Sequence, residues 1–144
     1  MTSRETVESL LRDAYAARVR GDIDGVCRCF STDPTFAMAG SNEASPLPMR
    51  VSDAASFRSA LANMIKSFEL HEPDILDMII DGPKAAVYWR ARVRSPSSGA
   101  EVVTEFVDLL VVEDGKIVSL VEFCDTALAN RMMDGMGGAE RPHA

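Results

Sequence analysis

The sequence predicts a single domain of the α+β class, with helices first and a run of antiparallel strands after them. Apolar residues recur at the helical spacing up to residue 68 and at the alternating spacing of strands beyond it. Helices and strands that are segregated in this way are typical of α+β folds, because a parallel sheet needs the two to alternate. A chain of 144 residues has the size of one domain, and it contains no internal repeat.

Two helices are predicted before residue 34. The first begins at a capping box formed by Thr2 and Glu5 and ends at Gly21, a residue type that favours the left-handed backbone of a helix end. The second is short, because Asp22 caps it and the Asp-Pro pair at residues 33–34 stops it. Both helices therefore carry their own start and stop signals.

A third helix is predicted after a short strand and a long loop. The strand covers residues 35–39, and residues 40–52 are predicted as a loop because they contain two prolines. Ser52 or Asp53 caps the third helix. Its apolar residues form the clearest helical stripe in the chain: Phe57, Ala60, Leu61, Met64, Ile65 and Phe68.

Four strands are predicted in the C-terminal half, over residues 75–80, 85–94, 102–112 and 117–124. Clusters of Gly, Pro, Ser and Asp separate them, as turns require. A last helical turn is expected over residues 126–133. The Gly-rich, polar residues 134–144 are expected to form a flexible C-terminal tail.

The composition argues against several classes of partner. The net charge is −7 and the pI is about 4.8. We therefore expect neither nucleic acid nor an anionic membrane as a partner, because both are negatively charged. The longest apolar run, residues 85–89, has five residues, whereas a membrane helix needs about 20. The polar N-terminus does not resemble a signal peptide.

The cysteines and histidines predict a cytoplasmic protein without a metal site. The 3 cysteines cannot all pair internally, and Cys27 and Cys29 stand two apart in a helical segment, so they point to different sides. Reduced thiols in a cytoplasm are the simplest interpretation. No CxxC motif is present, and the histidines are His71, near the start of a strand, and His143, in the tail. We therefore expect neither zinc nor another cofactor.

Two motifs near the ends of the chain are informative together. The first is Gly-Asp-Ile-Asp-Gly-Val at residues 21–26, followed by Phe30 and by Asp-Pro-Thr at residues 33–35. The second is Asp-Gly-Lys-Ile-Val at residues 114–118, followed by Glu-Phe-Cys-Asp-Thr-Ala at residues 122–127. With these motifs the chain resembles the SnoaL-like and ketosteroid-isomerase-like families of the nuclear transport factor two-like superfamily.

The resemblance implies a single SnoaL-like domain over residues 5–133. The architecture it implies is a cone-shaped α+β barrel, in which three N-terminal helices pack on a strongly curved antiparallel sheet around a hydrophobic pocket. Members of these families are often dimers, so a homodimer is expected. The families include isomerases, polyketide cyclases, epoxide hydrolases, dehydratases and proteins that only bind, so the fold leaves the activity open.

The loop at residues 113–115, Glu-Asp-Gly, decides which side chains share a sheet face. It fits a three-residue hairpin with the glycine in the left-handed conformation. This register puts Asp108 opposite Leu120 and Phe106 opposite Glu122, so the two carboxyls lie diagonally on one face. A two-residue Asp-Gly turn would instead put them on opposite faces. Matching to the family favours the first register.

Asp108 and Glu122 are the candidate catalytic residues. The resemblance matches Asp108 to the protonated aspartate that donates a hydrogen bond to an oxyanion in ketosteroid isomerases. It matches Glu122 to the catalytic aspartate on the closing strand of the limonene epoxide hydrolases. Two carboxyls in one apolar cone can split their pKa values and act as acid and base. The alternative is that one or both lie on the outer face, or pair with Arg90 or Arg92.

Other positions depart from the catalytic patterns of the family. By the same matching, Ala14 stands where ketosteroid isomerases carry the tyrosine of their oxyanion hole, and Met38 stands where they carry the general base. The Arg-x-Asp pair of the epoxide hydrolases falls near Trp89 and Ala91. Tyr15, a further catalytic candidate, lies next to the expected oxyanion position. Its hydroxyl could turn into the cone, or its ring could simply pack.

The two faces of the predicted sheet are given different roles. The inward face and the neighbouring elements are expected to supply an apolar pocket, lined by Met38, Trp89, Phe106, Leu110, Leu120 and Cys124. The outward face of residues 85–94 carries Tyr88 and the arginines at positions 90, 92 and 94. Because helices leave this face uncovered, we expect it to take part in a two-fold dimer.

Two functions of different classes stay open at this point. The first is an acid–base isomerase, cyclase or lyase that acts on an apolar, oxygenated ligand through Asp108 and Glu122. The second is a non-catalytic binding module for a small apolar ligand or a protein partner. The carboxyl pair favours the first function, whereas the apolar residues Ala14 and Met38 favour the second.

Overall fold

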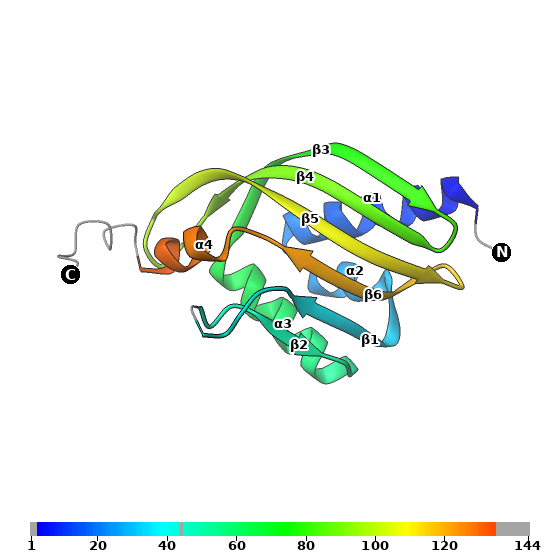
Figure 1. The fold of residues 1–144 in the computed structure, drawn as a ribbon, viewed down its shortest axis with the longest axis horizontal. Coiled ribbons are helices and arrows are strands. Elements are labelled where there is room, and N and C mark those ends of the chain that lie inside the picture. Colours follow the sequence, from blue (N-terminus) through cyan, green and yellow to red (C-terminus); the bar gives the residue numbers. More distant parts are fainter. Residues whose placement is uncertain (1–2, 44, 135–144) are drawn as a thin grey trace.

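The computed structural model describes residues 3–43 and 45–134 (Figure 1). In chain order the described elements are α1 (Arg4–Arg20), α2 (Ile23–Arg28), β1 (Phe30–Met38), β2 (Met49–Val51), α3 (Ala54–Ser67), β3 (Glu69–Asp81), β4 (Lys84–Arg94), β5 (Glu101–Glu113), β6 (Lys116–Phe123) and α4 (Thr126–Met133). The predicted flexible tail lies, apart from Asp134, outside the described residues, and so does His143. In the described part, no helix is long and apolar enough to cross a membrane.

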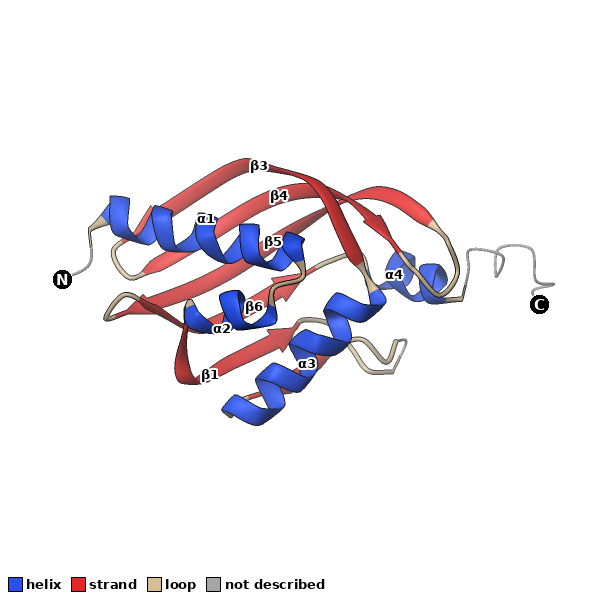
Figure 2. Cartoon of the chain, turned by 180° about the vertical axis from the view of Figure 1, so that it is seen from behind, coloured by secondary structure: helices blue, strands red, loops and turns tan. Residues whose placement is uncertain are grey.

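The strands form a six-stranded, strongly curved sheet in the order β2-β1-β6-β5-β4-β3. Helices α1, α2 and α3 lie together on one side of it (Figure 2). The predicted α+β fold with helices packed on a curved sheet is confirmed. The expectation that all strands pair antiparallel is wrong at one place, because β1 and β6 run parallel. They are not joined by a hairpin, so no turn sets their relative direction.

Three strands differ from their predicted limits. Strand β1 begins at Phe30 instead of residue 35 and accommodates Pro34 where its register with β6 shifts. The predicted loop at residues 40–52 contains the short edge strand β2, which begins directly after Pro48. Strand β3 begins at Glu69, well before residue 75, and its pairing with β4 is interrupted around Pro73. Proline is tolerated there because β3 is an edge strand.

The helix ends follow their capping residues. Ser3, not Thr2, caps α1, and its side-chain oxygen accepts a hydrogen bond from the backbone N–H of Thr6 at 3.1 Å. Gly21 ends α1 with a φ of 75°, the left-handed conformation that glycine adopts most easily. Asp53 caps α3. These ends fix where each helix enters and leaves the concave side of the sheet.

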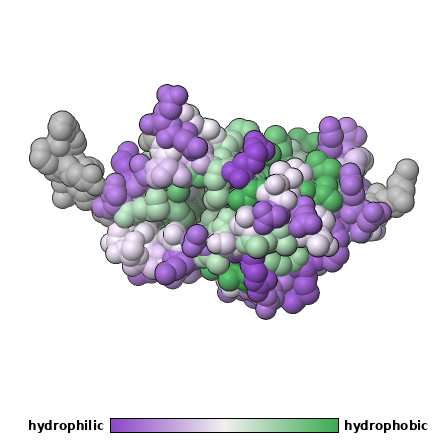
Figure 3. All heavy atoms as spheres, turned by 90° about the horizontal axis from the view of Figure 1, so that it is seen from below, coloured by the Kyte–Doolittle hydropathy of each residue, from purple (hydrophilic) through white to green (hydrophobic). Residues whose placement is uncertain are grey.

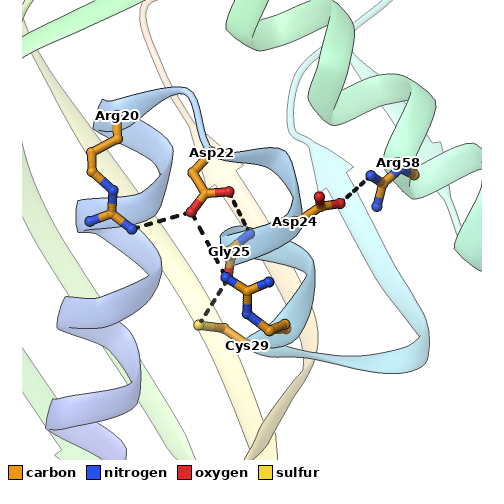
Figure 4. A network of polar contacts seen from close by, with 7 residues as sticks. Arg20, Asp22, Asp24, Gly25, Cys29 and Arg58 are labelled. Atoms are coloured by element: carbon orange, nitrogen blue, oxygen red, sulfur yellow. Dashed lines mark hydrogen bonds and ion pairs between the residues drawn. The ribbon is translucent and has the colours of Figure 1, made fainter.

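Asp22 caps α2 and gathers a small polar network (Figure 4). Its Oδ1 accepts from the backbone N–H of Gly25 at 2.9 Å, while Arg20 and Arg28 lie 3.4 Å and 3.9 Å from its Oδ2. A hydrogen bond from Gly25 lowers the pKa of Asp22. The ionised cap holds the tight turn between α1 and α2, which delivers the chain to β1.

The main core fills the space between the helices and the concave face of the sheet. From the helices it receives Val7, Leu11, Ala17, Phe57 and Leu61, and from β4 every second residue from Ala85 to Val93. Phe57 of α3 packs against Phe30 and Phe36 of β1, with ring centroids 4.6 Å and 6.1 Å apart. This packing holds α3 against β1, on the opposite side of the cone from α1.

Candidate active site

A two-residue turn joins β5 to β6. Asp114 and Gly115 have φ values of 51° and 74°, which are the left-handed conformations that a type I′ turn requires at both central positions. Glu113 therefore pairs with Lys116. The predicted three-residue loop is wrong, because Asp114 and Gly115 alone form the turn and Glu113 belongs to the strand.

A β-bulge in β6 then brings Glu122 onto the same face of the sheet as Asp108. Pairing between β5 and β6 shifts between Val111 and Val112, so that Val118 is left without a partner of its own. One extra residue on β6 reverses which of its side chains face inward beyond this point. As a result Asp108 pairs directly with Glu122, and both residues line the cavity under the sheet.

The predicted diagonal arrangement of the two carboxyls is therefore wrong in detail. Leu110, not Asp108, lies opposite Leu120. The two acids are nevertheless on one face, and they are closer than a diagonal pair would be, because directly opposed side chains have Cβ atoms about 4.5–5.5 Å apart. Neither acid lies on the outer face, because both line the cavity. Neither pairs with Arg90 or Arg92, which form ion pairs with Asp74 and Glu72 of β3.

Asp108 is held at the bottom of the cavity, and only 1% of its surface is exposed. Its Oδ2 accepts a hydrogen bond from Trp89 Nε1 at 2.9 Å and a second one from the hydroxyl of Tyr15. Its Oδ1 is also buried, and no N–H or hydroxyl of the described residues donates to it. A buried acceptor without a donor is costly, so the group next to Oδ1 decides how the site is protonated.

That neighbouring group is the carboxyl of Glu122, which is within hydrogen-bonding reach of Asp108. Two ionised carboxylates are both acceptors and cannot bond to each other. Asp108 Oδ1 is therefore satisfied when Glu122 carries a proton and donates it. Glu122 itself is half-buried, because one side of its carboxyl faces the cavity.

The electrostatics of the pair favour the same arrangement. Burial raises the pKa of Glu122 well above its usual value, and the negative charge of Asp108 raises it further. Burial also raises the pKa of Asp108, and hydrogen bonds from Glu122, Tyr15 and Trp89 offset only part of that rise. The two groups titrate as one unit, and the stronger rise of the pKa at Glu122 favours a proton on that residue.

Tyr15 packs through its ring and also turns its hydroxyl toward Asp108, so both alternatives for this residue occur together. Its ring packs edge-on against Trp89, with centroids 5.0 Å apart and an interplanar angle of 61°, and its hydroxyl donates to Asp108. Burial raises the pKa of Tyr15 well above its usual value, and Asp108 raises it further. Tyr15 is thus a neutral phenol that orients Asp108. On its other face Trp89 stacks on Phe106 at 4.4 Å, which fixes the indole N–H.

Arg18 is a cavity residue that the sequence analysis did not single out. It lies one turn after Tyr15 on the same face of α1. Its Nη2 donates to the backbone carbonyls of Phe68 at 3.0 Å and Met64 at 3.4 Å, at the end of α3. The available signal was an arginine four residues after Ala14, inside an otherwise apolar stripe.

The carboxyl pair opens into an apolar cavity of about 150 Å³. All six predicted pocket residues line it: Met38, Trp89, Phe106, Leu110, Leu120 and Cys124. The helices α1, α3 and α4 supply much of the remaining wall. Viewed from the side of α3 and β1, the molecule has a hollow bordered by hydrophobic residues (Figure 3). Its walls exclude water, which strengthens every polar contact inside.

Cys124 and Met38 form a soft, sulfur-rich part of the wall. The thiol of Cys124 lies 3.6 Å from Met38 Sδ. Burial raises the pKa of Cys124 to about 12, so it remains a neutral thiol and not a nucleophilic thiolate. Within residues 3–43 and 45–134, no three Cys, His, Asp or Glu side chains gather as a metal site would require.

Comparisons with known proteins agree with this architecture. The model of the SnoaL-like domain matches residues 11–120, while no curated protein matches the sequence. A proposed isomerase from Bacillus subtilis superposes with a TM-score of 0.83 at 14% identity, covering 94% of this chain and 97% of its own. An NTF2-like protein from Burkholderia xenovorans gives 0.76 at 22%, covering 92% and 99%. An epoxide hydrolase from M. tuberculosis gives 0.67 at 15%, covering 94% and 95%. At such identities the structural likeness concerns the fold alone.

Proposed function

This chain belongs to the family of SnoaL-like domains, and from that premise we propose that it is an acid–base catalyst acting on a small, oxygenated, largely apolar molecule. The reaction class is an isomerisation, cyclisation or elimination in which a proton moves. The observation that carries the proposal is the directly opposed pair of Asp108 and Glu122 in the lining of an apolar cavity, and the pair is proposed to share one proton.

The pair can serve as an acid and as a base. With the proton on Glu122, this residue donates it to an oxygen of the ligand. With the proton moved across the hydrogen bond to Asp108, Glu122 is a carboxylate that accepts a proton from the ligand. Because Glu122 is the more exposed of the two cavity-lining acids, it is the proposed catalytic residue and Asp108 is its positioning residue and proton reservoir.

Tyr15 and Trp89 favour the arrangement in which Asp108 is ionised and Glu122 carries the proton. Both donate to Asp108 Oδ2, so they stabilise the aspartate when it is ionised. They leave Oδ1 free for the proton shared with Glu122. Such fixed donors need no reorganisation during the reaction, which is where preorganised sites gain most of their advantage.

The size and lining of the cavity limit the ligand. A cavity of about 150 Å³ holds a molecule of roughly one aromatic ring, as an engineered apolar cavity of that volume holds benzene. The walls are mainly aliphatic, aromatic and sulfur-containing. The proposed ligand is therefore a small ring compound with a carbonyl or hydroxyl oxygen directed at Glu122.

A non-catalytic binding module is the second candidate. The observation that favours it is the burial of Asp108, which has 1% exposure and already accepts hydrogen bonds from Tyr15 and Trp89. In that case Glu122 would recognise a ligand oxygen by a hydrogen bond and no proton would be transferred. Both candidates use the same cavity, so turnover is the property that separates them.

Exchange of α-protons offers a test that does not require the natural substrate. Small cyclic ketones, from cyclopentanone to cyclohexenone, are incubated with the protein in D₂O and followed by NMR. The proposal predicts accelerated exchange for at least one ketone, and a loss of about 100-fold in Glu122→Gln. Glu105→Gln, on the outer face of β5, is the matched control and should exchange like the unmodified protein. No acceleration for any ketone would favour the binding module.

The protein is proposed to act as a cytoplasmic homodimer. Cys27, Cys29 and Cys124 are free thiols, which suits a reducing compartment. The convex face of the sheet exposes a continuous group of apolar side chains, with Ile79, Tyr88, Leu109 and Phe123 exposed by 60%, 39%, 45% and 47%. A second copy, related by a two-fold axis, would cover this face.

A further inference from the structure

Arg18 places a positive charge in the wall of a mainly apolar cavity. It lies on α1, one turn beyond Tyr15, and it is half-buried. Among the described residues no carboxylate lies within 4 Å of it. Buried charges are normally paired, because an isolated charge loses its hydration and gains no interaction that compensates for the loss. The carboxyl of Glu122 attracts Arg18 from a distance, so the guanidinium still has room for a directly bonded anion.

The contacts of Arg18 fix its position but do not use up its donors. Both of its hydrogen bonds come from Nη2, which donates to the carbonyls of Met64 and Phe68. A guanidinium has five N–H groups in a rigid fork. The hydrogens on Nε and Nη1 are left for other partners, and the side chain lines the cavity that Glu122 also lines. The two carbonyls at the end of α3 thus hold the guanidinium in place and leave its other N–H groups free to bind a ligand.

The other charges of the cavity do not neutralise Arg18 by contact. The charge of Asp108 is met by hydrogen bonds from Tyr15 and Trp89. Glu122 attracts Arg18 without bonding to it, and this attraction acts against the rise in the pKa of Glu122. Asp125, which also lines the cavity, accepts a hydrogen bond from the backbone N–H of Leu128 at 2.9 Å. In the part of the chain that the structure describes, Arg18 is consequently the one positively charged side chain that lines the cavity, and it has no carboxylate directly bonded to it.

We propose that Arg18 binds a carboxylate of the ligand, so that the substrate class is a small ring compound bearing a carboxylate. The fork of a guanidinium matches the two oxygens of a carboxylate. With the carboxylate on Arg18, the opposite end of the ring is directed to Glu122 on the facing strand. This orientation rests on the proposed function of Glu122, whereas binding of the carboxylate by Arg18 does not.

Paired probes separate charge recognition from simple filling of an apolar cavity. Benzoate and benzamide have nearly the same shape, but only benzoate carries the charge. Trp89 is the single tryptophan and stacks in the cavity wall, so its fluorescence reports binding of either probe. We expect benzoate to bind about tenfold tighter than benzamide, the difference that one charge-assisted hydrogen-bonded pair supplies.

Variants on the same helix assign the preference to Arg18. Arg18→Gln should bind both probes alike, Arg18→Lys should keep part of the preference because the charge remains, and Arg12→Gln should keep all of it. Arg12 is exposed and pairs with Glu8, so it is the matched control. Circular dichroism of each variant verifies that α1 and α3 are intact.

Three outcomes would overturn the proposal. They are equal affinities of the unmodified protein for the two probes, no binding of benzoate, and a preference that survives in folded Arg18→Gln. Benzoate has no exchangeable α-proton, so this experiment needs no turnover. Its failure would leave the acid–base proposal for Glu122 standing, and a failed ketone-exchange assay would leave the carboxylate site standing.

Discussion

Asp108 and Glu122 face each other directly across β5 and β6, and Asp108 Oδ1 has no other described donor. This relationship ties the protonation of one residue to the hydrogen bonding of the other. Their roles differ, because both acids line the cavity but Asp108 is fully buried whereas Glu122 is only half-buried. The consequences can be measured in stability, in assembly and in titration.

The stability of the protein should fall as the pH rises above the acidic range. Burial and the charge of Asp108 raise the pKa of Glu122 in the folded state, so the fold favours the neutral acid. Its contribution is complete below the unfolded pKa, near 4.3, and is lost as the pH climbs through the raised folded pKa. Between the two values the loss is about 1.4 kcal/mol per pH unit.

Urea unfolding at a series of pH values measures this dependence. Glu122→Gln should flatten it, because glutamine does not ionise and can still donate to Asp108 Oδ1. Glu105→Gln should leave the slope of the unmodified protein in place, since Glu105 bonds only to the exposed Tyr88. A slope that is unchanged in Glu122→Gln would show that another group is responsible.

Removal of the Tyr15 hydroxyl should destabilise the protein more than removal of the Tyr88 hydroxyl. Each hydroxyl donates to a carboxylate, but Asp108 is buried whereas Glu105 is exposed. Tyr15→Phe keeps the ring against Trp89 and should cost about 1–3 kcal/mol. Tyr88→Phe should change the stability little, because water screens its exposed hydrogen bond to Glu105. Urea unfolding compares the two, and equal losses would argue against a special role for Tyr15.

A charge on the convex face should separate the proposed dimer. Phe123 belongs to the apolar group there and is 47% exposed, so Phe123→Asp would place a carboxylate in the interface. Light scattering should give twice the 15.6 kDa of one chain for the unmodified protein and a single chain for the variant. The cavity side is untouched, so probe binding should persist. A monomeric unmodified protein at micromolar concentration would contradict the dimer.

The sequence predicts best those features that short stretches of chain determine. Gly21, Asp22 and Asp53 end or cap helices through their own backbone or side chain, and the alternation over residues 85–94 defines both faces of β4. The parallel pairing of β1 with β6 depends on contacts between distant segments. No local pattern encodes it.

In the β5–β6 hairpin, two differences from the predicted register compensate for each other. The turn is one residue shorter than predicted, which alone would have put Glu122 on the outer face. The bulge at Val118 restores the inward facing, and valine gives no sign of a bulge. The two acids therefore share one face, as predicted, although the register that predicts this is wrong.

Arg18 was missed for a different reason. A hydrophobic pattern assigns every arginine to the surface, although a long aliphatic stem can line a cavity while the guanidinium reaches a distant polar partner. Here the partner is the end of α3, whose carbonyls of Met64 and Phe68 hold the fork. Neither residue is close to Arg18 in sequence.

The most direct test of the central claim is a titration of the Asp108 and Glu122 carboxyls by ¹³C NMR, in the unmodified protein and in Asp108→Asn. A pair that shares one proton predicts a pKa for Glu122 well above its usual value of about 4.3, because burial and the charge of Asp108 both raise it. The value should fall in Asp108→Asn, since that charge is gone, yet stay above the usual one. If Glu122 titrates as an ordinary solvated acid, and Asp108→Asn leaves it unchanged, the two carboxyls share no proton and the acid–base account is contradicted.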